Sequence, residues 1–214
     1  MAQMEFRDRH DAGRVLARAL AQWRGQSEVV VLALPRGGVP VAWEVAPALQ
    51  ASLDVLVVRK LGFPGQEELA MGAIGPGGVR VMSDIPRLWP VEDAEVEKVV
   101  EREQAELARR ERLYRGERAP LALAGRVAIL VDDGLATGAS MHAAVLAVRA
   151  MRPRRIVAAA PVASREAVQL LETVADEVVC VHVPEPFRAV GIWYEDFEQT
   201  GDDEVRRLLQ GQGA

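Results

Sequence analysis

Short runs of apolar residues, rich in β-branched side chains, recur along the chain and are bounded by charged residues, glycine or proline. They occupy residues 29–34, 55–58, 127–131, 156–162 and 178–183. None alternates regularly between apolar and polar residues, and uninterrupted runs of this length are typical of strands buried on both faces. The pattern therefore predicts a parallel sheet with a helical layer on each side.

Helical patterns separate these predicted strands. Leu16, Leu20 and Trp23 share one face of a first helix. Further helices are expected at residues 39–50, 140–151 and 164–174. Pro47 should kink or end the second helix, because proline lacks an amide hydrogen and clashes with the preceding turn. Strands that alternate with helices predict right-handed βαβ units and a single α/β domain over residues 1–214, with ligands beyond the carboxyl ends of the strands.

Two segments depart from this alternation. Residues 62–78 hold six glycines and two prolines among 17 residues, so we expect a long flexible loop of the kind that often forms an active-site lid. Residues 91–118 are densely charged, and we expect an exposed helical insertion that packs through one thin apolar stripe. The alternative interpretation of its charges is a plain solvated face.

One segment joins a strand, two acids and a loop of small residues. The strand 127–131 is followed by Asp132 and Asp133, then by the loop 134–140 and a helix. Small residues let backbone N–H groups approach a phosphate, to which the helix dipole also contributes. The carboxylates can bind vicinal hydroxyls or approach Mg²⁺ through water. The segment predicts a phosphate site beside a sugar site, although Asp133 could instead simply cap the helix.

The order of apolar strand, Asp-Asp, three residues and Thr-Gly resembles the phosphoribosyl pyrophosphate signature of type I phosphoribosyltransferases. This resemblance implies a parallel sheet flanked by helices, with a flexible loop at 62–78 and a small C-terminal hood at 184–214. It also implies that Asp132 and Asp133 hold ribose hydroxyls and contact Mg²⁺ through water or substrate. The implied donor-binding loop consists of Gly134, Leu135, Ala136, Thr137, Gly138, Ala139 and Ser140.

Two further segments match this family. Arg36, Gly37 and Gly38 follow the first predicted strand, where the family has its pyrophosphate loop. Glycine allows the backbone to turn sharply and approach an anion there. Arg59 and Lys60 follow the second predicted strand, where related enzymes carry cations that face pyrophosphate. Two solvated basic residues are the alternative.

The acceptor base stays open. The tail 183–197 resembles the ending of hypoxanthine–guanine phosphoribosyltransferases. This makes Phe187, Trp193 and Tyr194 candidates for stacking on the base, or else for packing the end of the sheet. Ala136, however, replaces the aspartate of 6-oxopurine enzymes and matches adenine-type enzymes, in which a loop carboxylate handles the base proton. Glu67 and Glu68 are candidates for that carboxylate, or simple solvated charges.

The N-terminal segment Phe6-Arg7-Asp8-Arg9 resembles a poorly characterised bacterial group of predicted phosphoribosyltransferases. The chain has a net charge of −5 and no polybasic tail, so no nucleic-acid partner is expected. No apolar run approaches the roughly 20 residues that span a bilayer, and the start is too polar for a secretory signal. One cysteine excludes an intramolecular disulfide. We expect a cytoplasmic protein, with a homodimer consistent with the sequence.

These observations predict a phosphoribosyltransferase that moves ribose 5-phosphate from phosphoribosyl pyrophosphate to a nitrogenous base, with purines among the candidates, using Mg²⁺. A regulator that senses phosphoribosyl pyrophosphate is a second hypothesis. Hydrolysis of the donor is a third.

Overall fold

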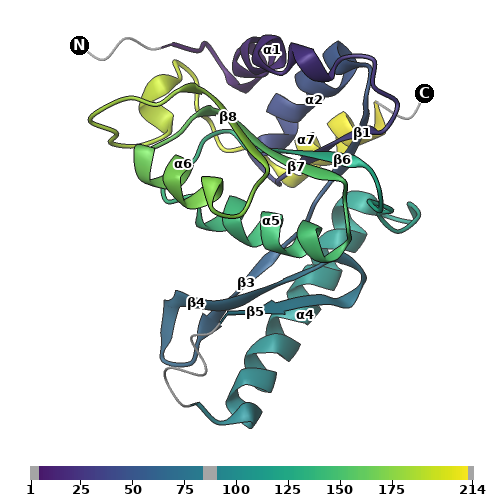
Figure 1. Cartoon of the computed structure of the whole chain (residues 1–214), viewed down its shortest axis with the longest axis vertical. Coiled ribbons are helices and arrows are strands. Elements are labelled where there is room, and N and C mark those ends of the chain that lie inside the picture. The colour runs from purple at the N-terminus through teal and green to yellow at the C-terminus, as the bar shows by residue number, and fades with distance from the viewer. Residues whose placement is uncertain (1–4, 84–90, 212–214) are drawn as a thin grey trace.

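The structure is a computed structural model that describes residues 5–83 and 91–211, apart from the side chain of Glu68. A larger α/β part carries a smaller sheet and a long helix on one side (Figure 1). The larger part is built on a parallel sheet with strand order β2-β1-β6-β7-β8. These strands are β1 (Val29–Ala33), β2 (Ser52–Val55), β6 (Val127–Val131), β7 (Arg155–Val162) and β8 (Glu177–His182).

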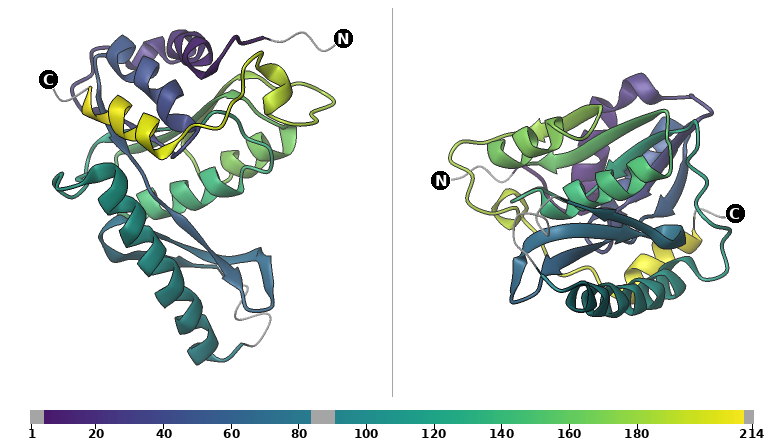
Figure 2. Two further views of the ribbon diagram at one scale, coloured as in Figure 1. Left: turned by 180° about the vertical axis from the view of Figure 1, so that it is seen from behind. Right: turned by 60° about the horizontal axis from the view of Figure 1, so that its bottom comes forward.

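Helices cover both faces of this sheet, as Figures 1 and 2 show. One face carries α1 (Arg9–Ala19), α2 (Gly38–Leu49) and α7 (Asp202–Gln210); the other carries α5 (Ala139–Ala150) and α6 (Arg165–Glu172). Successive strand residues point to opposite faces. Val31 and Ile129 therefore join the core beneath α1 and α2, whereas Val30 and Leu130 join the core beneath α5 and α6. The predicted α/β fold class is confirmed.

Residues 62–78 are not a structureless loop, and that prediction was wrong. They belong to an antiparallel sheet of β3 (Arg59–Phe63), β4 (Gln66–Gly75) and β5 (Val79–Met82), here called the small sheet. Its glycines serve turns and close contacts: Gly65, at φ +76°, makes the turn between β3 and β4. At Gly75 a Cβ would lie 2.8 Å from the Cβ of Ala147 in α5.

The charged segment forms α4 (Asp93–Arg115), a helix of 23 residues, as predicted. Its buried face consists of Val96, Val100, Glu103, Leu107 and Tyr114. The helix runs along the small sheet and continues to the larger part, where it packs near α7 (Figure 2). It is therefore a bridge between the two parts rather than a solvated appendage.

Two predicted boundaries shift. The strand expected at 55–58 is Ser52–Val55, so Arg59 and Lys60 open β3 instead of following a strand of the parallel sheet. Pro47 does not end α2, which continues to Leu49, because a proline in the last turn removes only one backbone hydrogen bond. No described helix is long and apolar enough to cross a membrane.

Candidate active site

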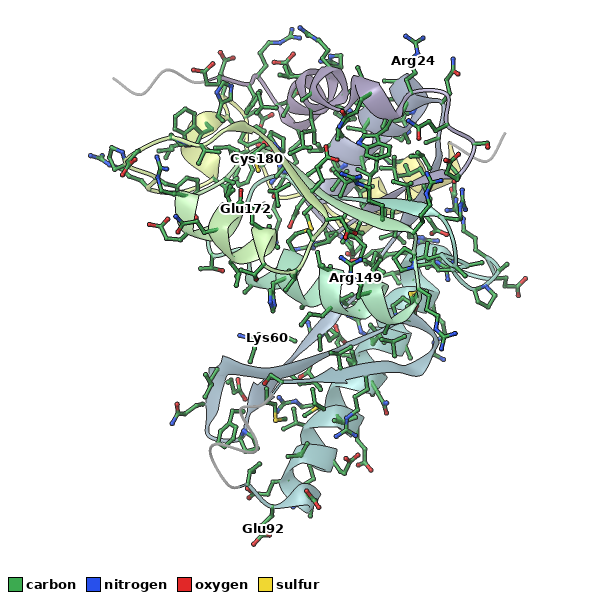
Figure 3. All side chains as sticks on the ribbon, viewed as in Figure 1. Arg24, Lys60, Glu92, Arg149, Glu172 and Cys180 are labelled. Atoms are coloured by element: carbon green, nitrogen blue, oxygen red, sulfur yellow. The ribbon has the colours of Figure 1, made fainter. Side chains whose placement is uncertain are left out.

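A cavity of about 520 Å³, here called the main cavity, opens where the loops after β1 and β6 meet the small sheet, α4 and α5. Four basic side chains line it: Arg59, Lys60, Arg102 and Arg110. Figure 3 shows Lys60 between the small sheet and α5. Ala139 and Ser140, in the first turn of α5, line the same cavity. Cations and a helix N-terminus together suit a multiply charged anion.

Three carboxylates balance these cations, namely Glu67, Glu103 and Asp132. Asp132 directly follows β6, and its Oδ1 accepts a hydrogen bond of 2.9 Å from the backbone N–H of Asp133. Desolvation, reinforced by the adjacent charge of Asp133, raises the pKa of Asp132 well above its usual range. Asp132 is therefore the member of the acidic pair that faces the cavity.

Asp133 does not line the main cavity. Its Oδ2 accepts a hydrogen bond of 2.7 Å from Nε of Arg9, and both side chains are largely buried. The Arg9 guanidinium lies 3.9 Å from the ring centroid of Phe197 and donates to the carbonyl of Glu198 at 2.7 Å. The Tyr194 hydroxyl donates to the Asp133 carbonyl at 2.5 Å. Arg9 therefore holds the carboxylate of Asp133, and Tyr194 holds its backbone carbonyl.

Arg9 was not among the sequence-derived site residues, and Tyr194 was a candidate only for stacking on the base, whereas its ring is buried and its hydroxyl holds the Asp133 carbonyl. The only signal for Arg9 was the Phe6–Arg9 segment itself, because an arginine that pairs across 124 residues leaves no local pattern. Phe6 forms a bridge with Tyr194, which brings the N-terminal segment against the tail.

The loop after β1 packs directly against the acidic pair. A Cβ on Gly37 would collide with the carboxylate of Asp133, and one on Gly38 would lie 2.5 Å from the carbonyl oxygen of Val131. These positions accept only glycine, for reasons of space. Glycine is needed at these positions, as predicted, but the anion that the backbone of Gly37 approaches is the carboxylate of Asp133 and not a ligand.

Arg36 points elsewhere. Its side chain lines a second cavity of about 240 Å³, here called the side pocket, together with Pro35, Arg109, Arg110, Tyr114 and Asp202. Arg36 Nη1 lies 3.8 Å from Oδ1 of Asp202. Pro35 and Arg110 line both cavities.

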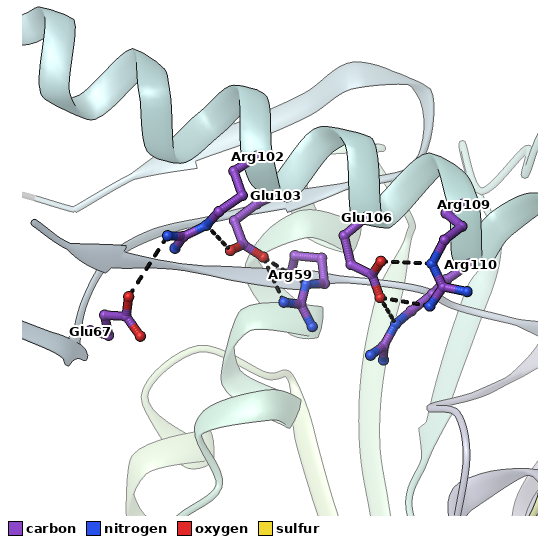
Figure 4. A network of polar contacts seen from close by, with 7 residues as sticks. All are labelled: Arg59, Glu67, Arg102, Glu103, Glu106, Arg109 and Arg110. Carbon is purple, nitrogen blue, oxygen red and sulfur yellow. Dashed lines mark hydrogen bonds and ion pairs between the residues drawn. The ribbon is translucent and has the colours of Figure 1, made fainter.

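A polar network joins α4 to the small sheet (Figure 4). Glu103, only 6% exposed, accepts hydrogen bonds from Arg59 Nε at 2.8 Å and from Arg102 Nε at 3.1 Å. Arg102 Nη1 also lies 3.7 Å from Oε1 of Glu67. Glu103 therefore holds two of the four cations that line the main cavity.

Sequence reasoning missed Glu103 and the arginines of α4. Their charges matched the pattern of a solvated helix, which hid their inward orientation. One signal was available: residues 96, 100, 103 and 107 follow the spacing of a single helix face. A glutamate at the third of these positions falls on the apolar stripe.

The loop 134–140 is held in place by its own hydrogen bonds and by Ser164 at the start of α6. Gly138, at φ +73°, precedes α5, and Thr137 Oγ1 accepts from the N–H of Ala139 at 3.3 Å. Ser164 donates to the carbonyl of Ala136 at 2.6 Å and caps α6 through the N–H of Ala167. Leu135 is buried, and Gly134 packs against Val190, so these two residues are structural members of the loop.

Phe187 and Trp193 lie in the C-terminal segment, away from the residues that line the main cavity. Both pack against the cluster of Phe6, Ala12, Val162 and Tyr194. The Trp193 ring stacks on His182 with centroids 6.2 Å apart, and its indole N–H has no partner among the described residues. In this structure both aromatic side chains pack the end of the sheet.

Comparison with known proteins identifies the family. The family profile described as "Phosphoribosyl transferase domain" matches residues 3–194. The chain belongs to this family. Two Mycobacterium tuberculosis proteins, from strains CDC 1551 and H37Rv and provisionally named phosphoribosyl transferases, are each 52% identical over 205 residues, or 95% of this chain. That match spans only 46% of each relative, so the chain covers somewhat less than half of their length.

Among solved structures, the protein TT1426 from Thermus thermophilus is similar over nearly the whole phosphoribosyl transferase chain. The two are 46% identical with a TM-score of 0.88, and the match covers 99% of this chain and 100% of TT1426. AQ2163 from Aquifex aeolicus shares the fold at 12% identity and a TM-score of 0.51, covering 86% of this chain and 78% of AQ2163. The type I phosphoribosyltransferase-like fold is therefore shown over the length of the chain.

Proposed function

We propose that this chain transfers ribose 5-phosphate from phosphoribosyl pyrophosphate to a nitrogenous base and releases pyrophosphate. One observation carries the proposal: the main cavity brings Arg59, Lys60, Asp132 and the first turn of α5 together around a single space. Such a space offers cations to a diphosphate, a carboxyl group to a sugar and a helix N-terminus to a monophosphate. The donor contains these three groups in one molecule.

The binding roles follow from this arrangement. Thr137, Gly138, Ala139 and Ser140 would bind the 5′-phosphate at the start of α5. Asp132 would bind the ribose hydroxyls from the cavity wall, while Asp133, held by Arg9, would position it. Pyrophosphate would lie against Arg59, Lys60 and the backbone of the loop that contains Arg36, Gly37 and Gly38.

The reaction breaks the bond between the anomeric carbon and the pyrophosphate oxygen, and forms a bond from that carbon to a base nitrogen. Positive charge develops on the ribose and negative charge on the leaving group, so fixed charges near each group lower the barrier. Lys60 and Arg59 would stabilise the departing pyrophosphate. Exclusion of water prevents hydrolysis of the donor, and closure of the small sheet would supply that exclusion.

A divalent cation fits the site only with help from the donor. Among the described residues, no group of three or more His, Cys, Asp and Glu side chains is arranged to hold a metal ion. Mg²⁺ commonly uses one or two carboxylates, substrate phosphates and water. Asp132 would be the protein's contribution, directly or through water, and the ion would neutralise charge on the diphosphate.

The acceptor remains the open part of the proposal, with purines among the candidates. Ala136 supplies no acid to the base, so a carboxylate of the small sheet, Glu67 or Glu68, would handle its proton. Glu67 lines the main cavity and has a side chain that is 77% exposed. A role in nucleotide salvage in the cytoplasm, with no nucleic-acid or membrane partner and with a homodimer as the assembly, belongs to the same proposal.

A screen of bases tests the proposal. The full chain would be incubated with radiolabelled phosphoribosyl pyrophosphate, Mg²⁺ and one base at a time, and pyrophosphate release would be followed. We expect release that depends on one class of base and is lost in Asp132→Asn. Release at the same rate without any base would identify a donor hydrolase instead. Tight donor binding with no release under any condition would support the sensing regulator.

A further inference from the structure

The side pocket contains a concentration of positive charge that donor binding leaves unused. It lies between the loop after β1, the C-terminal half of α4 and the start of α7. Arg36, Arg109 and Arg110 bring three guanidinium groups to a space of about 240 Å³. Of these, Arg36 and Arg109 do not line the main cavity.

The guanidinium groups on α4 are held in place from one side. Glu106 accepts from Arg109 Nε at 2.8 Å and Nη2 at 2.9 Å, and from Arg110 Nε at 2.7 Å (Figure 4). These hydrogen bonds lower the pKa of Glu106 to about 2, so the carboxylate stays ionised at neutral pH. An arginine side chain carries five N–H donors. Arg109 and Arg110 therefore keep donors for a ligand after binding Glu106.

The rest of the pocket wall is also ordered. Tyr114 is buried, and its hydroxyl donates to Oδ1 of Asp202 at 2.6 Å. Asp202 is thus engaged by Tyr114 and, at 3.8 Å, by Arg36. Three guanidinium groups face the carboxylates of Asp202 and Glu106, so the charge of the pocket stays positive.

Size and charge restrict the ligand. The pocket is smaller than the roughly 300 Å³ at which sites for larger organic ligands begin. Planar guanidinium groups with several donors match the oxygens of phosphate, and they bind dianions more strongly than neutral groups. We propose that the side pocket is a binding site for a small phosphate-type dianion, free or as a phosphate ester.

The side pocket and the main cavity share part of their wall, so an anion in the side pocket should affect donor binding. This coupling rests on the proposed transferase function. Arg110 and Pro35 line both cavities. An anion in the side pocket draws Arg110 toward itself and adds negative charge beside the pyrophosphate end of the donor. Occupancy of the side pocket therefore weakens donor binding, and the donor weakens anion binding by the same factor.

A phosphate titration of the full chain tests the site. Inorganic phosphate would be titrated by calorimetry into the wild type and three variants: Arg109→Gln, which alters only the side pocket; Lys60→Gln, which alters only the main cavity; and Arg112→Gln, a matched loss of charge on α4 outside both. Loss of one charged hydrogen-bonding partner should weaken binding at least about fivefold in Arg109→Gln. Because the main cavity also suits phosphate, the isotherms would be fitted with two sites. For the site that Arg109→Gln weakens, Lys60→Gln and Arg112→Gln should differ from the wild type by less than about twofold.

Two further arms define the ligand and the coupling. Methyl phosphate should bind about as well as phosphate if an ester is accepted, and acetate should bind far more weakly. Equal binding of acetate would overturn the assignment to a dianion. Phosphate should raise the apparent Kd for the donor more in the wild type than in Arg109→Gln, because direct competition in the main cavity is the same in both.

Other results would overturn the proposal. Absence of saturable binding at millimolar phosphate would do so, as would binding that Lys60→Gln abolishes and Arg109→Gln leaves intact, because the anion would then occupy the main cavity. The titration needs no turnover. A chain that transfers nothing but binds phosphate through Arg109 would refute the transferase proposal and leave the side pocket standing.

Discussion

Two adjacent carboxyl groups at the end of β6 have opposite environments. Asp132 faces the main cavity with no arginine in hydrogen-bond contact among the described residues, and its pKa is raised; Asp133 is paired with Arg9. The Asp-Asp motif alone could not show this difference, because the difference depends on an arginine 124 residues away in the sequence. The motif predicted that the pair binds the donor. The fold places only Asp132 at the cavity and gives Asp133 a structural partner, Arg9.

Replacement of Asp132 by asparagine should stabilise the fold in a pH-dependent manner. A raised carboxyl pKa means that the folded chain retains a proton longer than the unfolded chain does. Stability is therefore full below the usual aspartate pKa of about 4 and is lost as pH rises through the higher folded value. Asparagine cannot ionise, so Asp132→Asn should have the higher denaturation midpoint at pH 8, and the gap should close near pH 4.

Chemical denaturation at the two pH values measures this gap. Asp203→Asn is the matched control, since the Asp203 side chain is 96% exposed, and it should show no comparable gap. A constant difference between Asp132→Asn and the wild type at both pH values would contradict the prediction. Donor binding should fall in the same variant, so that function is lost where stability is gained.

At the scale of elements, the parallel sheet and its helices were predictable and the small sheet was not. Uninterrupted apolar runs located four of the five parallel strands within a residue or two, because burial on both faces leaves a clear pattern. In the small sheet, glycines at turns and close contacts weaken that pattern, and the same composition is typical of loops. Leu61, Met71 and Ile74 are nevertheless buried, and together with apolar residues of α4 they continue the core that lies on one face of the parallel sheet.

Glu103→Gln should weaken the donor site without unfolding α4. Glutamine keeps the volume but loses the charge that holds Arg59 and Arg102, so the two guanidinium groups become mobile in the main cavity. We expect the donor KM to rise about tenfold, equivalent to about 1.4 kcal/mol, with a smaller change in kcat. Glu101→Gln, an exposed acid on the same helix, is the control and should leave KM unchanged. An equal rise in both variants would refute a specific role for Glu103.

The small sheet should respond to the donor as a unit. Its strands pack on α4 and on α5, and we expect them to move together as one body when the donor binds. Amide hydrogens of β3, β4 and β5 should exchange more slowly when phosphoribosyl pyrophosphate and Mg²⁺ are bound, because closure reduces local opening. Amides of β8, at the far edge of the parallel sheet, should not change. Identical exchange of β3–β5 with and without saturating donor would refute closure.

Across the whole molecule, the site depends on contacts between distant parts of the chain. Arg9 reaches Asp133, Phe6 bridges Tyr194, and Arg115 of α4 pairs with Asp54 of β2. Local sequence patterns predict helices and strands well, but they do not indicate which distant residues pair in the fold. The side pocket lay outside sequence reasoning for the same reason, because α4, α7 and the loop after β1 converge only in the fold.

Arg9→Gln should destabilise the whole protein. The pair with Asp133 is largely buried, and removal of one partner leaves a buried charge uncompensated, at a cost of about 3 kcal/mol. Arg7→Gln removes an exposed pair with Asp11 and should cost less than about 1 kcal/mol. Urea denaturation of both variants measures the difference. Addition of Asp133→Asn should recover part of the loss, and strictly additive costs would show that the two residues act independently.

The contacts that hold Asp133 and Arg9 also determine when, during synthesis, the acidic pair can reach its final environment. Arg9 leaves the ribosome before Asp133, and Tyr194, Phe197 and Glu198 follow after Asp133. At about 5–20 residues per second, roughly 10 to 40 seconds separate the synthesis of Arg9 from that of Glu198. The parallel strands can pair as they emerge, but the acidic pair acquires its final environment only after the tail arrives. A nascent chain stalled before Tyr194 would contain every strand of the sheet and still lack a finished donor site.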